Sequence, residues 1–258
     1  NVGATVCYWL SMRKRCREIV MIDRHGVVAH GKALDILQAT SPEGSHTQIY
    51  NSTDYAMIED SDVVVVTAGA TRKPGMSRDD LLILNAGITK QVIYEVRKYA
   101  PNAIVIMVSN PLDAMTYTAL KAGCYPRNQV IGMAGILDSA RMETFISQKL
   151  GFGYGQVTAS VIGGHGDSMV PLPRYSSVNG VALTDLLTDE EIKEIIEQTR
   201  KGGAEIVGYM GTSAYYAPAN SVVKMIESIL SDARTIFPCA VLLEGEYGYK
   251  DTVNGVPV

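Results

Sequence analysis

The sequence lacks the features that mark several classes of protein. None of its four cysteines is spaced as C-x-x-C, and together they fit neither a zinc site nor a disulfide framework, so we expect reduced packing residues. No apolar run approaches the roughly 18 residues that cross a bilayer. The opening Asn1-Val2-Gly3 lacks the basic start of a signal peptide. These absences favour a soluble cytoplasmic protein without a metal.

Charge of one sign is also scarce. Lys and Arg number 23 against 27 for Asp and Glu, which gives a net charge of −4. Such a chain has no broad cationic field for phosphate backbones or anionic lipid, so neither nucleic acid nor a membrane is expected as a partner. With 258 residues, 47% hydrophobic and 19% charged, the composition is that of an ordinary globular protein with a proper core.

The first half of the chain alternates short aliphatic runs with segments of helical period. The runs are apolar at consecutive positions, as expected of parallel strands covered by helices on both faces. We expect strands at Ile19–Ile22, Val63–Val66 and Ile104–Val108. We expect helices over residues 3–15, 28–40 and 78–99, and another that starts at Pro111 with Asn110 as its N-cap.

The second half of the chain has a more mixed pattern. We expect a helix at Asp138–Leu150 closed by Gly151, a strand at Val157–Ile162, a capping box at Thr188–Glu191 and a helix at Ser213–Ser231. The pattern predicts an α/β fold with a boundary near residue 132. We expect residues 1–132 to form a Rossmann-type parallel sheet with helices on both faces, and residues 133–258 to form a mixed α+β substrate domain.

Gly3 and Asp23 have the spacing of two parts of a dinucleotide site. Gly3 precedes a helical segment, as the third glycine of G-x-G-x-x-G does, and Asp23 ends the next strand 20 residues later, where an acid holds the adenosine ribose hydroxyls. The alternatives are a flexible terminal glycine and a turn aspartate. A carboxylate at this place favours NAD, while Arg24 and His25 leave room for NADP.

Four motifs carry a more specific resemblance. They are Thr67–Arg78, with the sequence TAGATRKPGMSR, Ser109–Asp113 (SNPLD), Leu137–Arg141 (LDSAR) and Gly163–Asp167 (GGHGD). In this order and at these separations they resemble the lactate/malate dehydrogenase family. Members of that family begin earlier, with a first strand, and end later, with a strand and a long helix. We therefore expect this sequence to be an internal piece of a longer protein.

His165 is the candidate acid/base. Hydride transfer between an alcohol carbon and a nicotinamide needs a group that accepts the hydroxyl proton in one direction and returns it in the other, and the pKa of histidine suits both. Two glycines before it and one after allow a sharp turn at a strand end. A structural histidine is the alternative from the residues alone. The resemblance implies that His165 is the proton carrier.

The resemblance also implies a partner for His165. Asp138 resembles the carboxylate that orients the histidine, and a helix N-cap is its structural alternative. Arg141 lies three positions further along the same helix face, where it could hold a substrate carboxylate through two parallel hydrogen bonds. A solvated surface arginine is the alternative. By resemblance, Arg141 is the carboxylate anchor and Asp138 completes the catalytic pair.

The remaining assignments also follow from the resemblance. Arg78 polarises the substrate carbonyl, and Arg72 binds the second carboxylate where lactate enzymes usually have a glutamine. A solvated basic loop is the alternative for both. The other expected contacts are Asn110 and Ser213 with substrate, and Gly3, Asp23, Gly69, Asn85 and Asn110 with the cofactor.

The resemblance therefore implies an NAD-dependent dehydrogenase that interconverts malate and oxaloacetate. Arg72 argues against the nearest alternative, a lactate or other 2-hydroxyacid dehydrogenase. An alternative of another class is an inactive binding or scaffold protein with the same fold. By resemblance, we expect a homodimer or homotetramer.

Overall fold

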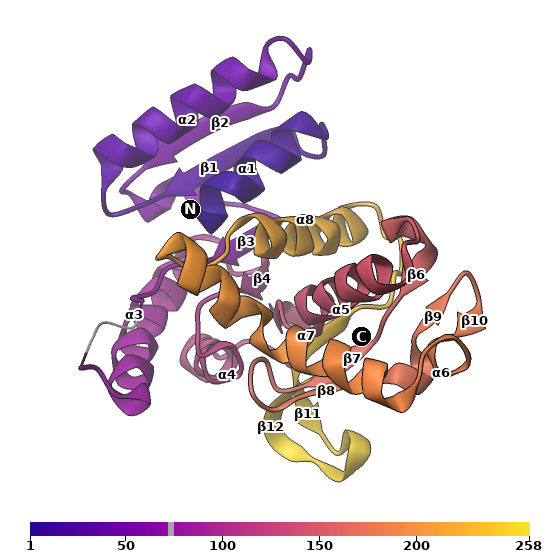
Figure 1. Ribbon diagram of the computed structural model, residues 1–258. Helices are drawn as coiled ribbons and strands as arrows, with labels where there is room; N and C mark the ends of the chain where they lie inside the picture. Colours follow the sequence, from indigo (N-terminus) through magenta and orange to yellow (C-terminus); the bar gives the residue numbers. More distant parts are fainter. Residues whose placement is uncertain (72–74) are drawn as a thin grey trace. The chain divides into compact units, whose positions relative to one another are not determined.

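The computed structural model describes residues 1–71 and 75–258, and they form two compact units (Figure 1). The first unit contains Asn1–Ile131 and Tyr215–Thr235, and the second contains Gly132–Ala214 and Ile236–Val258. The sequence pattern suggested one boundary, but the chain returns to the first unit at Tyr215. Arg72, an expected substrate contact, lies outside the described residues.

The first unit contains two parallel strand pairs. β1 (Glu18–Ile22) pairs with β2 (Gln48–Ser52), and β3 (Val63–Val66) pairs with β4 (Ile104–Met107). The sequence did not predict β2, because the segment QIYNS contains a single aliphatic residue and no aliphatic run. The expectation that all these strands are buried is correct for β4 but wrong for β1, which is only half-buried because one side borders a cavity.

Helices flank these strands in the first unit (Figure 1). They are α1 (Val2–Met12), α2 (Gly26–Thr40), α3 (Arg78–Tyr99), α4 (Leu112–Gly123) and α8 (Tyr216–Leu230), with short 3-10 turns η1 (Tyr55–Ile58) and η2 (Arg127–Gln129). The expected bounds of α3 are confirmed, because Ser77 and Asp80 form a reciprocal capping box. The expected start of α4 is wrong. Pro111 has an extended ψ of 121°, so it is the N-cap, and Asn110 precedes it.

Helix α8 is tied to α1 although more than 200 residues separate them in sequence. The Arg13 guanidinium donates to Glu227 Oε2 at 3.2 Å and to Asn220 Oδ1 at 2.9 Å, and Arg15 Nε donates to Glu227 Oε1 at 3.0 Å. These bonds explain why the segment from Tyr215 belongs to the first unit. The expected helix from Ser213 begins later, at Tyr216.

The second unit is built around α5 (Gly135–Leu150) and α7 (Asp189–Met210). The expected end of α5 at Gly151 is confirmed, with the glycine left-handed at φ 72°, and so is the capping box that begins α7 at Thr188. The core between these helices and the strands contains side chains that are at most 2% exposed: Met142, Ile146, Val161, Leu183 and Ile195. A short helix, α6 (Leu183–Leu186), precedes α7.

The strands of the second unit pair in an antiparallel manner, and all but β11 and β12 are short. β6 (Val157–Thr158), β9 (Ser177–Val178) and β10 (Val181–Ala182) form one sheet, β7 (Val161–Gly163) pairs with β8 (Met169–Pro171), and β11 (Pro238–Glu244) pairs with β12 (Lys250–Pro257). Ala240 of β11 also pairs with Gly132, the last residue of β5 (Val130–Gly132). The 3-10 turns are η3 (Tyr154–Gln156), η4 (Pro173–Tyr175) and η5 (Glu246–Gly248). The expected single strand at Val157–Ile162 is wrong, because the chain changes partner between β6 and β7.

The four cysteines are free thiols with different surroundings. Burial raises the pKa of Cys7 and Cys239 to about 12 and that of Cys16 to about 11, so all three are protonated at neutral pH. Cys124 is exposed at the end of α4 with φ 50°, so the expectation that every cysteine is a packing residue is wrong there. In the part of the chain that the structure describes, no helix is long and apolar enough to span a bilayer.

Candidate active site

His165 and Asp138 meet within the second unit. His165 lies just after β7, between Gly163 and Gly166, which have φ values of 83° and 105° that favour glycine. His165 Nδ1 is 2.9 Å from Asp138 Oδ2. The Asp138 side chain is 2% exposed and that of His165 is 15% exposed. An ionised carboxylate only accepts, so Nδ1 carries the hydrogen and Nε2 is the ring nitrogen suited to take a proton from an alcohol.

Asp138 is not the N-cap of α5. The helix starts at Gly135 with Ala134 as the N-cap, so Asp138 lies inside the first turn. A carboxylate near a helix N-terminus is stabilised by the positive end of the helix dipole. The two oxygens of the Asp138 carboxylate contact different side chains. Oδ2 faces His165, and Oδ1 accepts a hydrogen bond from Arg141 Nη1 at 3.0 Å. The carboxylate therefore orients an imidazole and a guanidinium at once.

Arg141 is largely buried, with a side chain 15% exposed, so the alternative of a solvated surface arginine does not apply. Its Nε is buried and has no hydrogen-bond partner among residues 1–71 and 75–258. A Cβ placed on Gly203 of α7 would lie 3.2 Å from Arg141 Nη2, so the absence of a side chain there leaves room for the guanidinium. A buried cation with an unsatisfied donor is suited to receive an anion.

The expected cofactor residues lie in the first unit: Gly69 follows β3, Asn85 lies on α3 and Asn110 follows β4. Asn85, 1% exposed, accepts from the Ala70 N–H at 2.7 Å and donates to the Asn110 carbonyl at 2.7 Å. Ser109 Oγ donates to the Ala68 carbonyl at 2.6 Å. Asn85 therefore uses its amide to hold two loops together, at the carboxyl ends of parallel strands where ligands of such sheets bind. No role for Ser109 was predicted from its place in the SNPLD motif.

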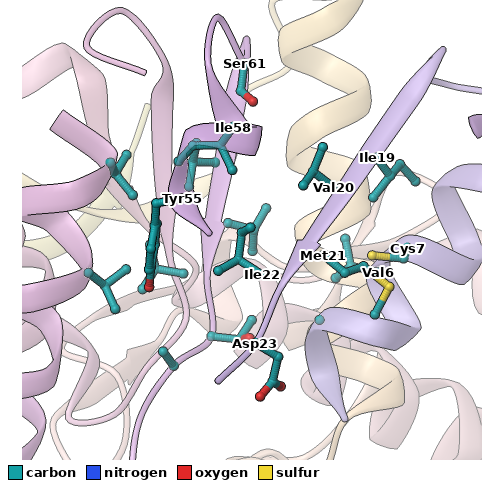
Figure 2. Close-up of a pocket in the computed structure, with 18 of the residues that line it drawn as sticks. Val6, Cys7, Ile19, Val20, Met21, Ile22, Asp23, Tyr55, Ile58 and Ser61 are labelled. Atoms are coloured by element: carbon teal, nitrogen blue, oxygen red, sulfur yellow. The ribbon is translucent and has the colours of Figure 1, made fainter. Parts of the chain in front are cut away.

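A cavity of about 1820 Å³ lies in the first unit between β1 and β3 (Figure 2). Gly3, Asp23 and Gly69 line it, whereas Asn85 and Asn110 do not. The strand segments Ile19–Ile22 and Val63–Val66 give the cavity an apolar wall, and the rest of its lining includes polar and charged residues. Figure 2 shows the Asp23 carboxylate at one end of this apolar wall. The exposed carboxylate, whose Oδ1 accepts from the His25 N–H at 2.8 Å, provides the acceptor that a ribose diol needs.

The other expected substrate residues lie at element ends. Arg78 is the first residue of α3 in the first unit, and Ser213 is an exposed residue of the second unit between α7 and α8. The second unit brings together the expected residues His165, Asp138 and Arg141, and the first unit brings together Asn85 and Asn110. In the described residues, no group of three or more His, Cys, Asp and Glu side chains could hold a metal ion.

Two family models cover nearly the whole chain. Residues 1–132 match the NAD binding domain of lactate/malate dehydrogenase, and residues 136–258 match the alpha/beta C-terminal domain of the same enzymes. The chain belongs to the lactate/malate dehydrogenase family, and it is an NAD-dependent oxidoreductase with a Rossmann-type first domain.

The relatives define its place in that family. The malate dehydrogenase of Sulfurimonas denitrificans is 61% identical over 100% of this chain and 81% of its own length, and that of Nitratiruptor is 56% identical over 100% and 81%. Among solved structures, the malate dehydrogenase of Salinibacter ruber has a TM-score of 0.95 at 44% identity, covering 100% of this chain and 82% of that chain. A lactate dehydrogenase of Cryptosporidium parvum, solved with lactic acid and NAD, has a TM-score of 0.94 at 40% identity over 99% and 82%.

Proposed function

We propose that this chain interconverts malate and oxaloacetate with NAD. The observation that carries the proposal is the buried Asp138 carboxylate, which holds His165 at 2.9 Å and Arg141 at 3.0 Å. Asp138 thereby places an imidazole, which can take a hydroxyl proton, beside a guanidinium, which can bind a carboxylate. Oxidation of a 2-hydroxy acid needs both groups. Relatives with 61% and 56% identity are malate dehydrogenases, which supports the choice of substrate.

NAD supplies the hydride acceptor at C4 of its nicotinamide when bound. The chain's residues do the rest: His165 takes the hydroxyl proton of malate on Nε2, and Asp138 stabilises the resulting imidazolium through Nδ1. Arg141 binds the carboxylate next to the reacting carbon, and Arg78 polarises the oxygen on that carbon. In the reverse direction His165 returns the proton to oxaloacetate. Asn110 and Ser213 complete the substrate contacts.

The direct assay follows NADH formation by the purified chain with NAD and L-malate, with L-lactate in a parallel reaction. We expect NADH to form with malate, because relatives at 61% and 56% identity are malate dehydrogenases. Oxidation of lactate alone would favour the other dehydrogenase of the family. No turnover with either substrate, by protein that still binds NADH, would favour the inactive scaffold.

We infer that Arg72 selects malate and oxaloacetate over lactate and pyruvate. Its guanidinium is suited to bind the second carboxylate, which lactate and pyruvate lack. We expect Arg72→Gln to lower the ratio of kcat/KM for oxaloacetate to that for pyruvate by at least about 30-fold, since loss of one member of a charge pair costs about 2–5 kcal/mol. Steady-state assays measure the ratio. If both efficiencies fall by the same factor, Arg72 does not select a dicarboxylate.

We also infer that Asp23 selects NAD over NADP, because an exposed carboxylate at this strand end hydrogen-bonds the ribose diol and repels a 2′-phosphate. A hydrogen bond to a charged group contributes about 1.5–3 kcal/mol, so Asp23→Ser should lower the preference for NAD by roughly 10- to 100-fold. The measurement is kcat/KM with each cofactor. Asp35→Ser, which removes an exposed carboxylate of α2 outside the cavity, is the control. An unchanged preference in Asp23→Ser contradicts the assignment.

We propose a homodimer or homotetramer. Helix α2 exposes four large apolar side chains: Val27 is 89% exposed, Val28 59%, Leu34 47% and Leu37 39%. Apolar side chains gathered on one helix favour burial against another protein surface. Sedimentation velocity tests the proposal, and a monomer at micromolar concentration would contradict it.

A further inference from the structure

The chain that leads to His165 changes partner just before it arrives there. β6 pairs with β9 and β7 pairs with β8, so Ala159 and Ser160 between them belong to neither ladder. A strand that changes partner leaves backbone N–H groups without ladder acceptors, and a buried N–H without an acceptor is costly. In this segment the N–H groups of Ala159, Ser160 and Val161 all donate to side chains.

The acceptors are Glu143 Oε1 at 3.2 Å, Ser176 Oγ at 3.3 Å and Ser139 Oγ at 3.0 Å, in that order along the chain. Two of the three, Ser139 and Glu143, lie on α5, four residues apart and so on one face of the helix. Ser139 is 7% exposed. Burial raises the pKa of the Glu143 carboxyl, and the hydrogen bond from the Ala159 N–H opposes that rise.

Helix α5 also contacts the β7 backbone directly. A Cβ on Gly135, the first residue of α5, would overlap the carbonyl oxygen of Val161. Val161 is therefore held at two points, through its N–H by Ser139 and through its carbonyl against Gly135. Both points are on α5, so its first turns fix the position of this strand.

The same helix and strand carry the catalytic pair. Asp138 directly precedes Ser139, and Val161 lies four residues before His165. A shift of β7 along α5 would therefore move Nδ1 of the histidine away from the carboxylate that orients it. A misplacement of about 1 Å can cost about 10²-fold in rate.

We propose that Ser139 and Glu143 are positioning residues that fix the register of β7 against α5, so that His165 meets Asp138 in the geometry needed for proton transfer. This inference rests on the function proposed above for its kinetic consequence. The competing interpretation is that the two side chains satisfy buried amides and contribute to stability alone. If the two side chains contribute to stability alone, variants that fold should keep the wild-type rate of the chemical step. If they are positioning residues, that rate should fall in folded variants.

The principal variant is Ser139→Ala, and the chain offers a matched control. Ser147 is also a buried serine of α5, 2% exposed, and its Oγ has no hydrogen-bond partner in the described part of the chain. We expect Ser139→Ala to lower kcat by about 10- to 100-fold and to raise the primary isotope effect with C4-deuterated NADH, while the NADH Kd is unchanged. Ser147→Ala should keep kcat within about twofold of the wild type.

Glu143 provides a second pair of variants if Ser139→Ala does not fold. Glu143→Gln retains an oxygen acceptor for the Ala159 N–H, whereas Glu143→Leu does not. We expect Gln to retain most of the wild-type kcat and Leu to lower it about tenfold. Equal kcat values for Gln and Leu would contradict the role of Glu143 in positioning.

A spectroscopic measurement separates this proposal from the proposed function. In protein labelled with ¹⁵N-histidine, the Nδ1–H signal of His165, assigned by its loss in His165→Asn, reports the bond to Asp138 without turnover. We expect the signal to shift or broaden in Ser139→Ala and to remain in Ser147→Ala. If the signal and kcat both stay at wild-type values while only Tm falls, the positioning role is wrong. If the wild type reduces no oxaloacetate but the signal still moves in Ser139→Ala, the function is wrong and the positioning role stands.

Discussion

Replacing His165 with asparagine is expected to lower kcat by about 10²- to 10⁴-fold, the usual contribution of general acid–base catalysis. Asparagine retains a polar side chain that can still face Asp138, but it cannot carry a proton near neutral pH. The NADH Kd should change little, because the histidine acts on the proton of the substrate. Steady-state kcat and a fluorescence titration with NADH measure the two effects.

The control for this substitution is His46→Asn. His46 is exposed in the first unit, outside the second unit that holds Asp138. We expect this variant to retain wild-type turnover. Retention by His165→Asn of more than about a tenth of the wild-type activity would mean that another group carries the proton.

Replacing Arg141 with glutamine is expected to lower kcat/KM for oxaloacetate by roughly 30- to several-thousand-fold, equivalent to about 2–5 kcal/mol for a buried charge that loses its partner. The loss has two sources. The substrate carboxylate loses its cation, and Asp138 Oδ1 loses the donor that lies 3.0 Å away. Arg141→Lys should recover only part of the loss, because an ammonium cannot form two parallel bonds to a carboxylate. Assays of both variants with oxaloacetate and NADH provide the measurement.

Arg200 provides the matched control for Arg141. It also pairs with a carboxylate three residues away on a helix, Glu197 at 3.2 Å, but both side chains are well exposed. Exposed pairs contribute about 0–1 kcal/mol to stability, so Arg200→Gln should leave kcat/KM within about twofold. Comparable losses in the two arginine variants would indicate a general effect of charge, and Arg141 would then have no specific role in binding the carboxylate.

Elements with strong local signals were predicted well from the sequence. The bounds of α3 and the start of α7 depend on capping boxes, and the end of α5 depends on a glycine that adopts φ 72°. The division between β6 and β7 could not be predicted. It depends on partners in β8 and β9 and on side chains of α5, and the apolar pattern of Val157–Ile162 contains none of this information.

In the candidate active site, too, residues within recognisable motifs were predicted, and residues whose role depends on tertiary contacts were not. His165, Asp138 and Arg141 were identified from sequence motifs, and the fold brings them together. Ser139 and Glu143 were not singled out, although they lie between or just beyond these residues in sequence. The sequence shows only that Ser139 and Glu143 are polar and lie four positions apart on a predicted helix. That spacing fits two solvated side chains as well as it fits two acceptors of backbone N–H groups.

Hydride transfer between NAD and malate can be followed directly with C4-deuterated NADH. The protein is given this cofactor with equimolar oxaloacetate and pyruvate, and mass spectrometry measures deuterium in the malate and the lactate formed. We expect malate to carry one deuterium at C2 and lactate to carry little. Label predominantly in lactate, or in neither product, would contradict the proposed function.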